Sequence, residues 1–86
     1  SQWVKIVKQR VHDEEFKKGL LVKKHHDAFV HDLARLDELL GDVMSKSIQL
    51  NHVNDFLNKF AGDKSNAVYN RKITFLKKVF SYIRDM

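Results

Sequence analysis

The placement of proline and glycine limits what this chain can fold into more than any other feature. Proline is absent, and the three glycines stand at positions 19, 41 and 62. Each glycine falls between segments whose apolar residues recur at three- and four-residue steps, the spacing of an amphipathic helix. Glycine commonly ends helices, and no strand-like alternation or internal repeat is present. The sequence therefore predicts an all-α fold, a compact bundle of four helices joined by short loops.

The helix boundaries follow from these breaks. We expect helices from Gln2 to about Lys18, from about Val22 to Leu40, from about Asn51 to Ala61, and onward from Ser65, a predicted N-cap. The acidic cluster Asp13–Glu15 could instead begin a separate helical turn, so the end of the first helix stays open. The apolar stripes predict a core formed by Trp3, Val4, Val7, Val11, Val22, Phe29, Leu33, Leu36, Leu40, Val53, Phe56, Leu57, Phe60, Tyr69, Ile73, Leu76, Val79, Phe80 and Ile83.

The bulk composition excludes several classes of protein. The chain has 86 residues, 43% of them apolar, which suits one domain over residues 1–86 and leaves no room for a deep substrate cavity. Without cysteine it forms neither a disulfide nor a cysteine zinc site. No apolar run approaches the roughly 18 residues of a membrane span. We expect an intracellular, soluble piece of a longer protein.

The charge pattern favours an anionic partner. Sixteen Lys and Arg against eleven Asp and Glu give a formal net charge of +5, and the stretch from Lys64 to Arg84 holds six basic residues and no acidic one. A merely solvated helix would normally intersperse acids among its cations, so this stretch favours DNA binding. Cations neutralise phosphates, while amides and hydroxyls reach phosphates or base edges. The face opposite the apolar stripe carries Asn66, Asn70, Arg71, Thr74, Lys77 and Lys78.

A second basic group begins the second helix. Lys23, Lys24, His25 and His26 stand where the helix dipole disfavours positive charge. A bound phosphate would relieve that conflict, and free backbone N–H groups at a helix start also favour an anion. We therefore expect phosphate contact here; the alternative is a basic patch that the fold tolerates.

The sequence carries no enzyme signature. A glycine-rich phosphate loop, a Ser-His-Asp set and paired carboxylates are not recognisable. The histidines at 12, 25, 26, 31 and 52 lack the regular spacing of metal ligands on one helix face, so we expect surface or phosphate-facing histidines, no metal and no cofactor. Tyr69 and Tyr82 lie on or near an apolar stripe, which predicts core residues with hydroxyls at the rim.

Three segments resemble one family in the order in which they occur. Residues 24–33 (KHHDAFVHDL), closing in LLGD at 39–42, resemble the second helix of the core-binding domains of phage integrases, which are tyrosine recombinases. Residues 48–57 (IQLNHVNDFL) are similar to the short helix that follows. Residues 65–80 (SNAVYNRKITFLKKVF) are similar to the family's last helix, with its Asn-Arg pair and closing aromatic. The likeness covers about three quarters of the chain, and the first helix departs from it most.

The resemblance implies a SAM-like core-binding fold that forms half of a clamp around the recombination site, with the second and fourth helices against double-stranded DNA. Catalysis in such proteins belongs to a following domain, so this chain would be non-catalytic and would position the core site during DNA integration. It would come from a bacterial or phage-encoded, cytoplasmic protein of a mobile element. Other protomers would be partners of the full-length protein, and the piece alone would be a monomer without membrane contact.

The charge pattern and the resemblance together give one set of expected DNA contacts. These are Lys23, Lys24, His25, Lys64, Ser65, Asn66, Asn70, Arg71, Thr74, Lys77 and Lys78. The main rival function is a helical protein-interaction module whose cationic helix meets an acidic partner. A stand-alone helix-turn-helix repressor is disfavoured, because no short tight turn precedes the basic helix.

Overall fold

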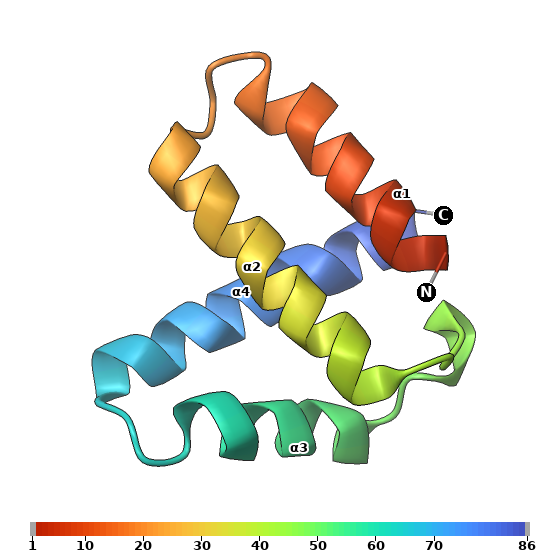
Figure 1. The fold of residues 1–86 in the computed structure, drawn as a ribbon, viewed down its shortest axis with the longest axis vertical. Coiled ribbons are helices and arrows are strands. Elements are labelled where there is room, and N and C mark those ends of the chain that lie inside the picture. The colour runs from red at the N-terminus through yellow and green to blue at the C-terminus, as the bar shows by residue number, and fades with distance from the viewer. Residues whose placement is uncertain (1, 86) are drawn as a thin grey trace. The chain divides into compact units, whose positions relative to one another are not determined.

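The computed structural model describes residues 2–85, and helices account for most of them (Figure 1). The four α-helices are α1 (Gln2–Val11), α2 (Lys23–Leu40), α3 (Leu50–Ala61) and α4 (Asn66–Arg84). A π-helical turn, η1 (His12–Phe16), continues α1, and a 3-10 turn, η2 (Ser45–Ser47), precedes α3. Residues 2–85 contain no strand, so the all-α prediction with four helices is confirmed.

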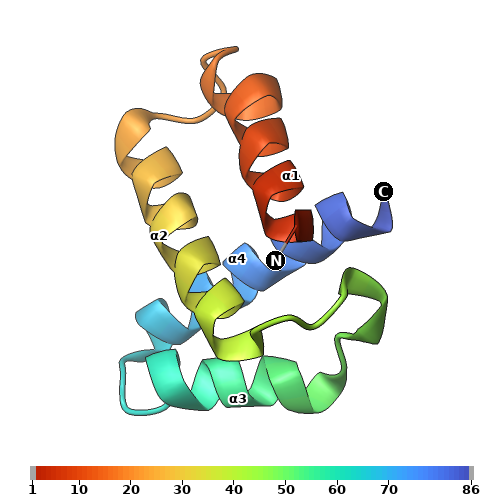
Figure 2. The same cartoon turned by 45° about the vertical axis from the view of Figure 1, so that its right-hand side comes forward.

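The chain divides into two compact units, Ser1–Asp42 and Val43–Met86. In the first unit, α1 and η1 both contact α2, and the two helices run side by side in both views (Figures 1 and 2). In the second unit, α3 contacts α4. Each unit is thus a pair of helices joined by a loop. The expectation of one domain over residues 1–86 stays a prediction.

The core of the first unit follows the predicted stripes closely. Its buried apolar residues are Trp3, Val4, Val7 and Val11 from α1, and Phe29, Leu33, Leu36 and Leu40 from α2. The prediction for Val22 is wrong, since 60% of it is exposed. Val22 is the N-cap of α2 and has an extended backbone, so its side chain does not follow the helical stripe.

The first helix ends earlier than Lys18 because the chain changes its hydrogen-bond pattern. The Lys17 N–H donates to the His12 carbonyl at 2.8 Å, a five-residue step typical of a π-helix. The chain then turns at Gly19, whose φ of +77° is a conformation that glycine adopts without steric cost. The acidic cluster Asp13–Glu15 lies within η1, which begins at His12 and follows α1 without a break. Gly41, with φ +63°, ends α2 in the same way.

The second unit has an aromatic centre. Phe56 of α3 is fully buried, and its ring centroid lies 5.7 Å from that of Phe75 on α4 and 5.0 Å from that of Phe60. The start of α3 is capped by its own side chains, since the Gln49 N–H donates to His52 Nδ1 at 2.9 Å. The buried residues of this unit are Phe56, Leu57, Ala61, Phe75, Leu76 and Val79.

The stripe predicted for α4 is partly wrong. Tyr69 is 42% exposed, and Phe75, which was left out of the predicted core, is buried. The buried residues of α4 are Phe75, Leu76 and Val79, so the covered side of this helix includes Phe75. Tyr69, near the start of the helix, lies outside that side. Tyr82 is half-buried. Five other residues of the predicted core are half-buried and not fully buried: Val53, Phe60, Ile73, Phe80 and Ile83.

Truncating the best-buried leucine should reveal how much the fold depends on these stripes. Leu33 is 1% exposed, and we expect Leu33→Ala to lower the free energy of unfolding by about 2–5 kcal/mol, because it leaves a cavity. Leu20→Ala is the matched control, since Leu20 is 74% exposed and should change that energy by less than about 0.5 kcal/mol. Urea unfolding followed by circular dichroism measures both. Equal losses would contradict the core described above.

Candidate nucleic-acid interface

The expected DNA contacts fall in both units. Three of them, Lys23, Lys24 and His25, begin α2 in the first unit. The other eight belong to the second unit, on α4 and in the loop before it. We describe the two groups separately.

The α4 group forms an exposed polar face. Ser65 caps the helix as predicted, because its Oγ accepts from the Val68 N–H at 3.4 Å. Lys64 and Ser65 are exposed, and Lys78 is half-buried. The exposed members on the helix itself are Asn66, Asn70, Arg71, Thr74 and Lys77. Residues 66, 70, 74 and 77 are spaced for one helix face, so the polar side of α4 points away from its buried side as the sequence predicted.

The Thr74 hydroxyl is less available to a binding partner than its exposure suggests. Its Oγ1 donates to the Asn70 carbonyl at 3.0 Å, a bond to the preceding turn of the same helix. The hydroxyl proton is therefore engaged, and only lone pairs remain for a partner. Because a phosphate oxygen needs a donor, Thr74 would contribute less to phosphate binding than Arg71 or Lys77.

The net charge of the protein resides in the second unit. Val43–Met86 holds eight Lys and Arg against three Asp and Glu, which is a net charge of +5 and equals that of the whole chain. Ser1–Asp42 holds eight of each sign and is neutral overall. Because α4 contains no acidic residue, the positive potential of the second unit is concentrated on and around this helix.

The basic start of α2 is exposed but partly compensated. Lys23 Nζ lies 3.2 Å from Asp27 Oδ2, with 80% and 60% of the two side chains exposed. Such a surface pair contributes little stability, so Lys23 remains free to exchange partners. Lys24 and His25 are exposed, and Val22 supplies no side-chain cap to the helix. Phosphate contact at this helix start stays a prediction.

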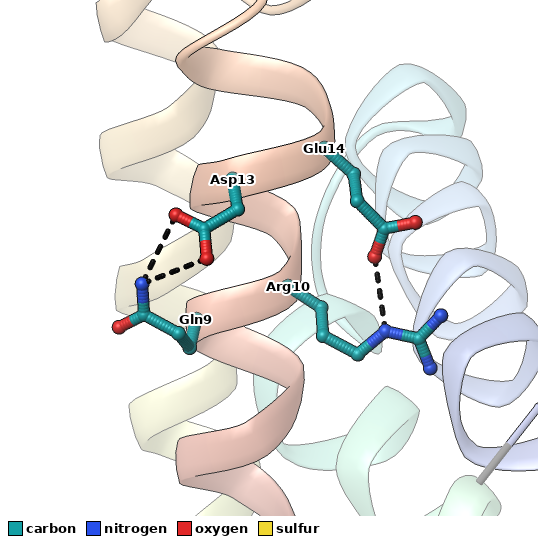
Figure 3. A network of polar contacts seen from close by, with 4 residues as sticks. All are labelled: Gln9, Arg10, Asp13 and Glu14. Atoms are coloured by element: carbon teal, nitrogen blue, oxygen red, sulfur yellow. Dashed lines mark hydrogen bonds and ion pairs between the residues drawn. The ribbon is translucent and has the colours of Figure 1, made fainter.

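The junction of α1 and η1 holds a group of exposed hydrogen bonds and ion pairs (Figure 3). Gln9 Nε2 donates to both carboxylate oxygens of Asp13 at 3.1 Å, and His12 Nδ1 lies 3.1 Å from Asp13 Oδ1. On the other flank, Arg10 Nε donates to Glu14 Oε2 at 2.9 Å. The hydrogen bond from Gln9, followed by that from His12, lowers the pKa of Asp13 below its ordinary value. Asp13 is thus ionised at neutral pH.

His26 is the side chain whose surroundings the sequence did not reveal. The expectation of a surface histidine is wrong here, because only 13% of its side chain is exposed. The ring stacks on Phe16, with centroids 4.5 Å apart, and meets the edge of His12 at 5.7 Å. The sequence did place Lys5, Lys8, Gln9 and His12 on one helix face, because they follow its three- and four-residue steps. In the structure these four residues line the same hollow as His26.

Within residues 2–85, no three His, Asp or Glu side chains gather closely enough to hold a metal ion. None of the described helices is both long and apolar enough to cross a membrane.

The chain was compared with protein-family models, with curated proteins and with solved structures, and none of them matched. The integrase resemblance therefore rests on the sequence segments alone.

The ionisation of Asp13 offers a direct test of the η1 network. We expect Gln9→Leu to raise the Asp13 pKa, because the largest cause of its lowering is lost. The pKa of Asp13 is lower in the folded chain than in the unfolded chain, so its ionised form stabilises the fold at a pH above the ordinary Asp pKa. This contribution is lost as the pH falls below about 4. Carboxyl-carbon NMR titration measures the midpoint. Gln2→Leu, the same change elsewhere on α1, should leave it unaltered; identical midpoints in the two variants would refute the assignment.

Proposed function

We propose that this chain is the DNA-binding core-binding module of a phage-type tyrosine recombinase, a mobile-element integrase, and that α4 is the helix it lays against duplex DNA. The observation that carries the proposal is the concentration of the entire net charge of +5 in the second unit, around a helix with no acidic residue. The order of the three integrase-like segments supports the family. Catalysis is assigned to a separate domain of the parent protein.

The exposed face of α4 has the chemistry that a duplex requires. Arg71 and Lys77 neutralise phosphates and release counterions. Asn66 and Asn70 carry amides that both donate and accept, so they suit base edges in the major groove, where adenine presents a matching pair. An α-helix with its side chains is about 10–12 Å across, which matches the width of that groove. The buried residues Phe75, Leu76 and Val79 hold the helix by its opposite side.

The start of α2 supplies a secondary contact in this proposal. Lys24 and His25 are exposed at a helix start whose backbone N–H groups favour phosphate, and Lys23 can leave Asp27 for a phosphate. Because few phosphates are contacted by the piece alone, we expect binding in the micromolar range or weaker, falling steeply with salt. Tighter binding in the full-length protein would come from its other domain and from other protomers.

The test measures fluorescence anisotropy of a labelled duplex of about 20 base pairs across a salt series. We expect Asn70→Ala/Arg71→Ala to weaken binding at low salt by about 1–3 kcal/mol and to reduce the salt slope by about 1, because one phosphate contact and one amide are removed.

Lys46→Ala/Asn54→Ala is the matched control for charge and composition. Both residues are exposed in the second unit and lie outside α4, so the DNA affinity should stay close to that of the unchanged chain. Absence of binding at low salt, or equal losses in the two double variants, would refute the proposal. An acidic protein partner for α4 would then be the better explanation.

A further inference from the structure

The first unit contains a hollow that is lined by polar residues. The hollow has a volume of about 350 Å³ and is lined by Lys5, Lys8, Gln9, His12 and His26. The first four follow one face of α1 and its continuation into η1, and His26 reaches the hollow from α2. Every lining residue is polar and has nitrogen that can donate a hydrogen bond. This arrangement occurs in a unit whose net charge is zero.

The two histidines share an orientation that leaves the same ring nitrogen unused. His12 Nδ1 lies 3.1 Å from Asp13 Oδ1, and His26 Nδ1 lies 3.7 Å from Asp27 Oδ1. A carboxylate at Nδ1 orients the ring and leaves Nε2 for a ligand, as carboxylates do behind metal-bound histidines. Asp13 and Asp27 therefore support the rings without lining the hollow.

His26 Nε2 is the atom in this hollow that most needs a partner. It is buried, and no hydrogen-bond partner for it exists within residues 2–85. A buried polar atom left unsatisfied costs about 1–3 kcal/mol. Stacking on Phe16 and the edge contact with His12 fix the plane of the ring. A ligand bound in the hollow that His26 lines would supply that partner.

We propose that this hollow binds a phosphate group. Two ammonium groups, an amide and two imidazoles surround a space large enough for a phosphate with several waters, since a water occupies about 30 Å³. A tetrahedral phosphate presents oxygens in several directions, so it can lie against His26 Nε2 on α2 and accept from Lys5 and Lys8 on α1 together. A small phosphate compound and a nucleic-acid backbone both offer this chemistry.

The π-helical turn is the element that builds the site. It brings Phe16 under the ring of His26 and places His12 beside both rings, with centroids 5.6 Å from Phe16 and 5.7 Å from His26. Single π-helical turns inside helices occur frequently at functional sites, because they offset the side chains from regular helical positions. All the residues that line the hollow belong to the first unit, and none of them is on α4.

The test uses inorganic phosphate as the probe and the whole 86-residue chain. Phosphate is titrated at constant ionic strength, with chloride as the replaced anion, and amide and imidazole nitrogen signals are followed by NMR. We expect saturable shifts at Lys8, Gln9 and His12 and at the His26 ring. Shifts no larger than those caused by chloride would overturn the proposal.

Two variants locate the binding. His26→Phe keeps an aromatic ring against Phe16 but removes both nitrogens, and Lys5→Gln/Lys8→Gln removes both charges from exposed positions. Each should weaken phosphate binding about tenfold or more, the loss of at least one charge-assisted hydrogen bond. Lys17→Gln/Lys18→Gln makes the same charge change outside the hollow and should keep the affinity. Equal losses in the two lysine pairs would overturn the site.

A short DNA duplex then identifies the source of the phosphate. If the duplex shifts the His26 ring signal and Lys5→Gln/Lys8→Gln weakens DNA binding, the ligand is a backbone phosphate. If inorganic phosphate shifts that signal and the duplex does not, the ligand is a free phosphate compound. Because inorganic phosphate tests the hollow directly, its result does not depend on the DNA binding proposed for α4.

Discussion

Burial of one apolar stripe against another is the interaction on which the structure depends. Isolated helices shorter than about 12–15 residues are marginal in water, and α1 and α3 have 10 and 12 residues. Their stability must come from the longer helices they contact, α2 with 18 residues and α4 with 19. The fully buried side chains Val7, Val11, Leu33, Phe56 and Val79 mark these contacts.

The same burial decides where polar chemistry is displayed. On α4, covering Phe75, Leu76 and Val79 leaves the opposite face to Asn70, Arg71 and Lys77, which no acidic neighbour on that helix neutralises. On α1, covering Val4, Val7 and Val11 leaves the adjoining face to lysines, an amide and a histidine. In both units a polar surface is therefore the geometric complement of a core stripe.

The two surfaces differ in the way they would hold an anion. The α4 face is exposed and cationic, which suits a large polyanion whose phosphates release counterions. The hollow of the first unit is small, sits in a neutral unit and depends on imidazoles held by ring stacking and by carboxylates. Long-range charge would attract ligands to the first surface, whereas local hydrogen bonding would select them at the second.

The sequence by itself determined the helical class, the breaks at Gly19 and Gly41, most of the core and the polar face of α4. These are consequences of local spacing, because a stripe at three- and four-residue steps forms one side of a helix wherever that helix packs. Tertiary structure alone decided which part of α4 is covered, so that Phe75 is buried and Tyr69 is exposed. It also decided the surroundings of His26, whose partners Phe16 and His12 come from another element through a change in hydrogen-bond register. Contacts of this kind depend on how elements meet in space, which periodicity along one helix does not record.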